Sequence, residues 1–242
     1  MEQEWKENIC IADNVISSEI IDNWTSYLFS QCQWGVNFQN GTVFLNNEFF
    51  ENREKNKIYE QFQFVSLQRI ENKDFNPITH LLYLPLVNWC MYNNFTIDYN
   101  DISKCKLNVT TRAKKESKDK YSLPHIDLVN HQPNQFTAIY YLNDCDGDTF
   151  LFKQSAQELS NKNLDSFSNL TIKSRISPKK GRLIIFPIDQ VHAGSHPIES
   201  GYRAVINYNF KMQYMPTKNE KINNWEKTGL EIQRFNFKDL QY

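Results

Sequence analysis

Apolar residues recur at two different spacings along this chain, and the spacing separates expected helices from expected strands. One helix is expected over residues 18–30, with Ser17 as its N-cap, packed on the outer face of a large sheet. A second is expected from Ile78 to Tyr92, restarting at Pro85, because proline interrupts the hydrogen bonding of a helix interior. The expected buried stripe of this second helix comprises Leu81, Leu82, Leu86, Trp89 and Cys90.

Most of the remaining apolar segments have the short, β-rich pattern of strands. Residues 7–15 indicate a short strand, and residues 34–50 indicate strands joined by a turn at Asn40-Gly41. Residues 55–70 fit a helix or a strand. Four clearer strands are expected in the second half of the chain, at 136–143, 149–152, 181–187 and 203–210. A chain with these segments is predicted to be mainly β with flanking helices.

Composition narrows the class of protein. The 242 residues are 40% hydrophobic and 14% aromatic, which suits one domain with a substantial core. The formal net charge of −1 gives no field that would attract nucleic acid. Five scattered cysteines without a CxxC motif favour free thiols. Residues 1–8 lack the apolar stretch of a secretory signal, and no apolar run is long enough to span a bilayer, so we expect a soluble cytoplasmic protein without a membrane partner.

Candidate chemistry begins at His125-Ile126-Asp127. In a strand, residues i and i+2 point to the same face, so His125 and Asp127 are expected to converge on one point. His192 comes later, after the apolar strand that ends at Pro187, and Arg203 opens the last strand. Two imidazoles and one carboxylate suit Fe(II) with positions left open. The cation at Arg203 is then placed to anchor a dicarboxylate co-substrate.

Two other histidines lie close to these residues in sequence. His196, only seven residues before Arg203, is a rival of His192 for the third ligand position. His131 and His196 are expected to be exposed loop residues. His80 falls among the apolar positions of the second helix and is expected to be structural.

From about Leu107 to Met212 the sequence resembles the catalytic core of the prolyl-4-hydroxylase-like 2-oxoglutarate/Fe(II)-dependent dioxygenases. The resemblance rests on these pieces: His125-x-Asp127, Tyr140-Tyr141-Leu142-Asn143, Gly147-Asp148-Thr149, Gly181 to Pro187, His192 and Arg203. The family often has a second glycine where this chain has Asp148, and many members have lysine in place of Arg203. The resemblance implies a double-stranded β-helix (jelly roll, cupin-like) core.

The resemblance also implies roles for particular residues. His125, Asp127 and His192 would be the metal ligands and Arg203 the anchor of 2-oxoglutarate. These four residues form the expected catalytic set. Tyr141 would donate its hydroxyl to the same carboxylate, and strand alternation allows only one of Tyr140 and Tyr141 to face the pocket. Asn207 and Asn209 share the parity of Arg203, and Asn207 is expected to contribute to the co-substrate site.

The implied reaction consumes O2 and 2-oxoglutarate and releases succinate and CO2, with hydroxylation of an unactivated C–H bond in a peptide, a prolyl residue or a small molecule. Ascorbate is an expected accessory reductant. We expect one dioxygenase domain over 1–242, with an N-terminal α/β support (about 1–106), a catalytic core (about 107–212) and a tail (213–242). Two alternatives remain open, which are a non-catalytic cupin-type metal-binding protein and a nucleic-acid base oxygenase.

Two loops are expected to choose the substrate. Residues 112–122 are rich in lysine and lead into the His125 segment. This stretch is either a solvated loop or a mobile lid over the site. Residues 155–170 are rich in serine and asparagine and indicate an insertion between strands.

Overall fold

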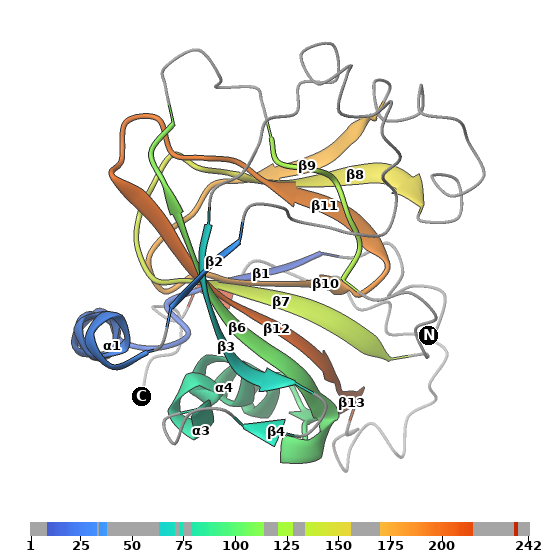
Figure 1. The fold of residues 1–242 in the computed structure, drawn as a ribbon. Helices are drawn as coiled ribbons and strands as arrows, with labels where there is room; N and C mark the ends of the chain where they lie inside the picture. Colours follow the sequence, from blue (N-terminus) through green and yellow to red (C-terminus); the bar gives the residue numbers. More distant parts are fainter. Residues whose placement is uncertain are drawn as a thin grey trace.

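The computed structural model describes residues 9–32, 34–37, 63–70, 73–74, 79–113, 121–127, 134–155, 170–214 and 235–236. Far more of these residues lie in strands than in helices (Figure 1). The strands of the large sheet are β1 (Cys10–Asp13), β2 (Gly35–Asn37), β3 (Gln63–Ile70), β4 (Lys73–Asp74), β6 (Ile102–Thr111), β7 (Gln135–Tyr141), β10 (Leu183–Pro187), β12 (Tyr202–Lys211) and β14 (Phe235–Asn236). The smaller sheets contain β8 (Thr149–Ser155), β9 (Ile172–Ile176) and β11 (Gln190–Gly194), and β5 (Phe95–Thr96) with β13 (Gln213–Tyr214).

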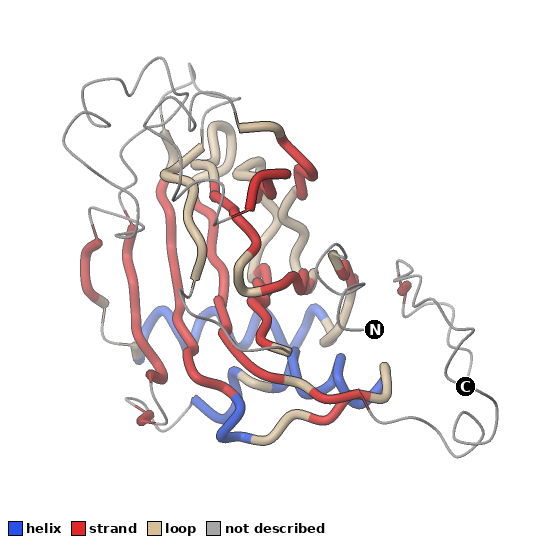
Figure 2. Tube along the Cα trace, turned by 90° about the vertical axis from the view of Figure 1, so that its right-hand side faces the viewer, coloured by secondary structure: helices blue, strands red, loops and turns tan. Residues whose placement is uncertain are grey.

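The two principal sheets face each other as the halves of a jelly roll. The large sheet has the order β14-β1-β10-β7-β12-β6-β3-β2, with β4 paired to β3, and the small one has the order β11-β8-β9. Neighbouring pairs are antiparallel except β1 with β14. The long strands of the large sheet run side by side in Figure 2. The chain is therefore mainly β with a double-stranded β-helix core, as predicted.

The helices cover the face of the large sheet that is turned away from the small sheet (Figure 1). They are α1 (Ser18–Gln31), α3 (Thr79–Leu82) and α4 (Leu84–Tyr92), and a 3-10 turn spans Tyr99–Asp101. Ile21 and Leu28 of α1 join the same buried cluster as Leu86 and Trp89 of α4. Both helices thus stabilise the sheet by burying apolar surface.

Alternation along each strand separates this helix-facing core from the space between the sheets. On β12, Ala204 and Ile206 face the helices, whereas Val205 packs between the sheets with Leu151 of β8. The helix-facing cluster is apolar, but the opposite face of the large sheet carries the polar residues of the predicted site. The alternation expected for the last strand is therefore confirmed.

Some sequence-based expectations need correction. Leu81 was expected in the buried stripe but is 49% exposed, because the helical segment breaks at Tyr83 and α4 restarts around Pro85. The ambiguous residues 63–70 form strand β3. The turn at Asn40-Gly41, residues 114–120 of the possible lid, most of the 155–170 insertion and most of the tail lie outside the described residues. None of the described helices is both long and apolar enough to cross a bilayer.

Candidate metal centre

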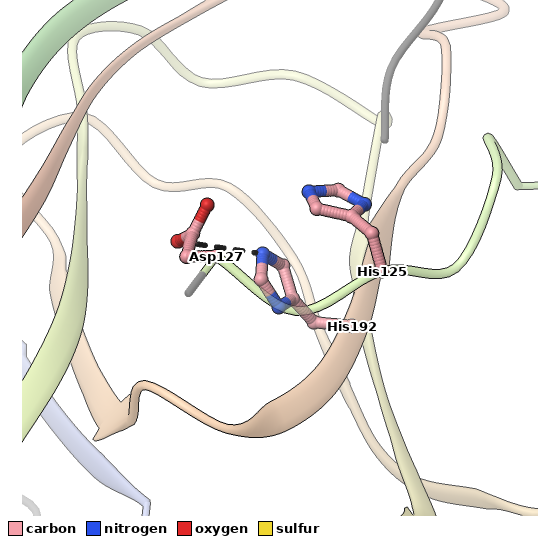
Figure 3. Close-up of side chains that lie close together, drawn as sticks. All are labelled: His125, Asp127 and His192. Carbon is pink, nitrogen blue, oxygen red and sulfur yellow. Dashed lines mark ion pairs between the residues drawn. The ribbon is translucent and has the colours of Figure 1, made fainter. Parts of the chain in front are cut away.

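The backbone of β11 brings His125 and His192 together. The His125 N–H donates to the carbonyl of His192, and the His192 N–H donates to the carbonyl of His125, each at 2.9 Å. Two residues that exchange both backbone hydrogen bonds form a hydrogen-bonded antiparallel pair. They stand directly opposite each other, so their side chains lie next to each other on one side. The two imidazole ring centroids are 4.5 Å apart. Figure 3 shows both rings turned toward Asp127.

Asp127 completes the group. One ligand atom from each of the three residues lies within 4.8 Å of the others, and His192 Nε2 is 3.9 Å from Asp127 Oδ2. His125 and Asp127 do not lie on a regular strand as expected, because residues 121–127 pair with the rest of the protein only through isolated bridges. The alternation argument was thus wrong about local structure. The convergence it predicted is nevertheless present.

Each imidazole is oriented by a backbone carbonyl. His125 Nδ1 lies 2.9 Å from the Leu123 carbonyl oxygen, and His192 Nδ1 lies 2.9 Å from that of Gln190. A carbonyl oxygen only accepts, so Nδ1 carries the proton in both rings. Nε2 is then left with a free lone pair, which is the form that binds a metal ion.

The charge states also suit a metal. Burial lowers the pKa of His125 to about 3, and the neighbouring His192 adds to this effect. Burial likewise lowers the pKa of His192. Burial by itself would raise the pKa of Asp127, but Lys104 and the two histidines together lower it below its ordinary value. At neutral pH the site thus offers two neutral imidazoles and one carboxylate, the protonation states that metal ligation requires.

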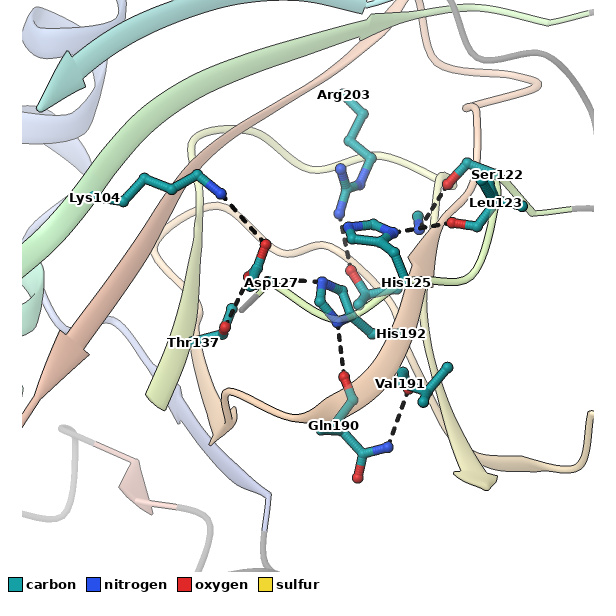
Figure 4. Close-up of polar contacts among 12 residues, drawn as sticks. Lys104, Ser122, Leu123, His125, Asp127, Thr137, Gln190, Val191, His192 and Arg203 are labelled. Carbon is teal, nitrogen blue, oxygen red and sulfur yellow. Dashed lines mark hydrogen bonds and ion pairs between the residues drawn. The ribbon is translucent and has the colours of Figure 1, made fainter. Parts of the chain in front are cut away.

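Two residues that the sequence reasoning missed hold the Asp127 carboxylate (Figure 4). Thr137 Oγ1 donates to Oδ2 at 2.7 Å, and the Lys104 ammonium donates to Oδ1 at 3.5 Å. Thr137 has the same strand parity as Tyr141, which was the available signal for it. Lys104 comes from β6, and nothing in the sequence around it indicates that it would contact Asp127. Both contacts fix the carboxylate and keep it ionised.

Thr137→Val should weaken divalent metal binding about tenfold to a hundredfold, because it removes the hydrogen bond that orients Asp127 while keeping the side-chain volume. The measurement is equilibrium dialysis against Fe(II) under anaerobic conditions. Thr96→Val, at an exposed threonine of β5, is the control and should bind as wild type. Equal affinity in all three proteins would show that Thr137 does not position the ligand.

A second polar cluster lies between the two sheets, where Arg203 of β12 meets Thr149 of β8. Arg203 is 4% exposed, and its Nη2 donates to Thr149 Oγ1 at 2.8 Å. The Tyr141 hydroxyl lies 2.7 Å from the same oxygen. Arg203 Nε is buried without a hydrogen-bond partner among the described residues. A buried guanidinium N–H of this kind is costly unless an acceptor arrives.

Tyr141 faces this cluster, whereas Tyr140 belongs to the core beneath the helices. Tyr141 is therefore the tyrosine on the side that carries Arg203, and its part in co-substrate binding stays a prediction. Asn207 and Asn209 are 6% and 3% exposed, and the Oδ1 atom of each has no partner in the described part of the chain. Their parity places both amides on the face that carries Arg203.

The other histidines considered in the sequence do not belong to the candidate metal centre as far as the structure describes them. His196 is only 7% exposed and its Nδ1 lies 2.7 Å from the Thr111 carbonyl oxygen, so the expectation of an exposed loop residue was wrong. It is not part of the one His/Asp group found among the described residues. The His80 side chain is 65% exposed and its ring stacks on Tyr99 at 4.9 Å. His131 lies outside the described residues.

The turn before β8 needs a glycine at position 147. A Cβ there would lie 2.8 Å from the Ser195 carbonyl oxygen and 3.1 Å from Arg203 Cδ. Asp148, which stands where the resembling family often has a second glycine, is buried and pairs with the Arg175 guanidinium. The ion pair with Arg175 therefore explains how a carboxylate can be buried at this position, where the family often has glycine.

Gly147→Ala should destabilise the fold by about 1–3 kcal/mol, because the backbone of the neighbouring loop must move to accept the methyl group. Gly201→Ala is the matched control, since a Cβ at Gly201 meets nothing within 4 Å. Urea unfolding of both variants and of wild type measures the difference. If the two variants unfold at the same urea concentration, the turn is not tightly packed.

Comparisons with known proteins agree with this architecture. Residues 111–211 match the family model described as the 2OG-Fe(II) oxygenase superfamily. A 2OG-Fe(II) oxygenase family oxidoreductase from Burkholderia pseudomallei is similar in structure, with a TM-score of 0.54, 11% identity, and coverage of 87% of this chain and 88% of that one. The chain is also similar to SnoK, a non-heme alpha-ketoglutarate-dependent carbocyclase from nogalamycin biosynthesis, with a TM-score of 0.54, 12% identity, and coverage of 90% and 87%.

A third similar structure is AviO1 from Streptomyces viridochromogenes, with a TM-score of 0.52, 14% identity, and coverage of 89% of this chain and 95% of that one. At these identities the structures support the fold alone. A search of curated protein sequences gives no match. The match to the model of the 2OG-Fe(II) oxygenase superfamily covers the segment that holds His125, Asp127, His192 and Arg203.

Proposed function

We propose that this protein is an oxygenase that hydroxylates an unactivated C–H bond, with His125, Asp127 and His192 as the Fe(II) ligands and with Arg203 and Tyr141 as the anchor of 2-oxoglutarate. The observation that carries the proposal is the presence of two sites between the same two sheets. One is a group of three ligands with preset tautomers, and the other is a buried arginine with an unpartnered N–H.

The residues fit both cofactors by their chemistry. Two imidazole nitrogens and one carboxylate are the donor set of non-heme Fe(II) oxygenases and leave coordination positions open. Arg203 supplies a fixed counter-charge for the distal carboxylate of 2-oxoglutarate, and its free Nε–H matches a carboxylate acceptor. Thr149 joins Arg203 and Tyr141 through its hydroxyl, so we include it in the anchor.

In the overall reaction, R–H, O2 and 2-oxoglutarate give R–OH, succinate and CO2. When bound, Fe(II) and 2-oxoglutarate supply the oxidative decarboxylation and the oxidising power, which are cofactor chemistry. The protein supplies the geometry. Thr137 and Lys104 orient Asp127, and the carbonyls of Leu123 and Gln190 orient the two imidazoles. The buried anchor holds the co-substrate in a pocket of low dielectric constant, where its charge pair is strongest.

The polar cluster around Arg203 favours the oxygenase over a cupin-type metal-binding protein. A storage site needs no arginine for a dicarboxylate, and burying one without an acceptor would only cost stability. A nucleic-acid base oxygenase would be expected to carry a basic footprint, which the net charge of −1 does not provide. We therefore propose a peptide, prolyl or small-molecule substrate.

Two measurements test the proposal. The first is the visible charge-transfer band of the anaerobic Fe(II)·2-oxoglutarate complex, which should appear when both are added to the protein. The second is succinate formation with peptides, free amino acids and oligonucleotides in turn, with ascorbate present to keep iron reduced. Absence of the band in wild type would reject the oxygenase assignment. Succinate formation stimulated only by oligonucleotides would instead favour the base oxygenase.

A further inference from the structure

Strand β6 places two lysines on the inner face of the large sheet. Cys105, between them, belongs to the helix-facing core, so Lys104 and Lys106 point the other way. Across the sheet, Lys106 is paired with Asn207 and Lys104 with Asn209. The row of Lys104 and Asn209 continues to Thr137 on β7, which contacts Asp127, and Lys106 lies in the next row along on the same face.

The two lysines differ in their partners. Lys104 donates to Asp127 and its side chain is 25% exposed. Lys106 has no hydrogen bond or ion pair within the described part of the chain. It stands two residues from Lys104 on the same face of the same strand, the face from which Lys104 reaches Asp127, and its charge contributes to lowering the pKa of His125 and His192. Burial, together with the charge of Lys104, lowers the pKa of Lys106 to about 8, which leaves the amine mostly charged at neutral pH.

The formal charges around the proposed site, with Fe(II) and 2-oxoglutarate bound, show that one positive charge lacks a partner. The two positive charges of Fe(II) and the one of Arg203 are balanced by Asp127 and the two carboxylates of 2-oxoglutarate. Lys104 shares Asp127 with the metal through its own ion pair, so Lys106 is the cation left without a counter-charge among the described residues. A partly buried cation without a partner is costly, and an anion that enters beside it relieves that cost. Because the co-substrate is already accounted for, the missing anion belongs to another molecule.

We propose that the primary substrate presents an anionic group, a carboxylate or a phosphate, that binds Lys106 beside the metal site. This inference rests on the proposed oxygenase function, because the charge count includes Fe(II) and 2-oxoglutarate. The surrounding surface suits a polar substrate. Asn108 and Asn209 share this face, and each has a buried Oδ1 without a partner among the described residues. An apolar substrate would leave these amides and Lys106 unsatisfied.

The test compares Lys106→Met, which keeps the side-chain length without its charge, with Lys106→Arg, which restores a cation. Lys153→Met is the control, because Lys153 is an exposed lysine on β8. Anaerobic calorimetry titrates each Fe(II)·2-oxoglutarate complex with matched probes. The probes are N-acetylglycine with its amide, glycerol 3-phosphate with glycerol, and inorganic phosphate.

Wild type and Lys153→Met should bind at least one anionic probe about tenfold or more tightly than its neutral mate, as expected for a charged hydrogen bond. Lys106→Met should lose this preference and Lys106→Arg should keep most of it. Affinity for 2-oxoglutarate should not change in any of the four proteins. Comparison of the carboxylate probe with the phosphate probes identifies which anion the site prefers.

Three results would overturn the proposal. No binding of any anionic probe to wild type would show that the lysines do not form an anion site. An undiminished preference in Lys106→Met would assign the anion to another residue. Weaker binding of 2-oxoglutarate in Lys106→Met would place Lys106 in the co-substrate site instead. If the wild-type complex shows no charge-transfer band, the oxygenase function fails, and the same titration of the metal-free chain still reports whether Lys106 binds the probes.

Discussion

His192→Ala should reduce turnover to the background of the metal-free protein and should lower the bound Fe(II) from one equivalent to well below it. His192 is one of the three proposed ligands found together among the described residues, and the contact of its Nδ1 with the Gln190 carbonyl orients the ring. No other described histidine belongs to the group. His125→Ala and Asp127→Ala should have the same effect for the same reason. Succinate formation and the iron content of the protein after dialysis measure it.

The fold should largely survive these substitutions, because apolar clusters on both faces of the large sheet stabilise it without the metal. Near-ultraviolet circular dichroism of each variant checks this point. His196→Ala is the matched control. It should retain bound Fe(II), although it should unfold at a lower temperature because His196 is buried and hydrogen-bonded. Full activity in His192→Ala together with loss in His196→Ala would reverse the choice of ligand.

Strand alternation was the most predictable feature of the molecule. A period of two along β7 allowed only one of Tyr140 and Tyr141 to face inward, and the resemblance favoured Tyr141. The burial of the neighbouring residues on β7 and β12 agrees with this alternation. Such a pattern depends only on neighbouring residues, so one sequence suffices to read it. The convergence of His125 and Asp127 was also predicted. The reason given for it was wrong, because a mutual pair of hydrogen bonds with His192, rather than a strand, holds the segment.

Contacts between distant segments were not predictable. Lys104 reaches Asp127 from a strand more than twenty residues earlier, and no local pattern marks that lysine as different from the others in the chain. The burial of His196 similarly depends on the Thr111 carbonyl, which is brought near by the pairing of β6 with β12. Register between strands fixes such contacts, and register depends on the whole sheet. The exposure of Leu81 follows from a helix break whose position shifts the buried face.

Arg203→Ala should raise the concentration of 2-oxoglutarate needed for half-saturation by roughly tenfold to a thousandfold, corresponding to ~1.5–4 kcal/mol for a lost charged pair. Arg203 is buried, and its Nε–H has no acceptor among the described residues. Tyr141→Phe should act in the same direction but more weakly, since one hydroxyl hydrogen bond contributes about 0.5–1.5 kcal/mol. Titration of the charge-transfer band with 2-oxoglutarate measures both.

Binding of Fe(II) should be nearly unchanged in Arg203→Ala, because Arg203 contacts Thr149 rather than any of the three ligands. Arg112→Ala is the control for removing an arginine. Its guanidinium donates to backbone carbonyls of Ile198 and Glu199, so its loss should lower stability without changing 2-oxoglutarate affinity. If the charge-transfer band is also weakened in Arg112→Ala, the loss of 2-oxoglutarate affinity would be explained by displacement of the loop rather than by loss of the Arg203 charge. An unchanged band in Arg203→Ala would mean that the co-substrate is anchored elsewhere, since no other arginine shares the buried cluster with Tyr141 and Thr149 among the described residues.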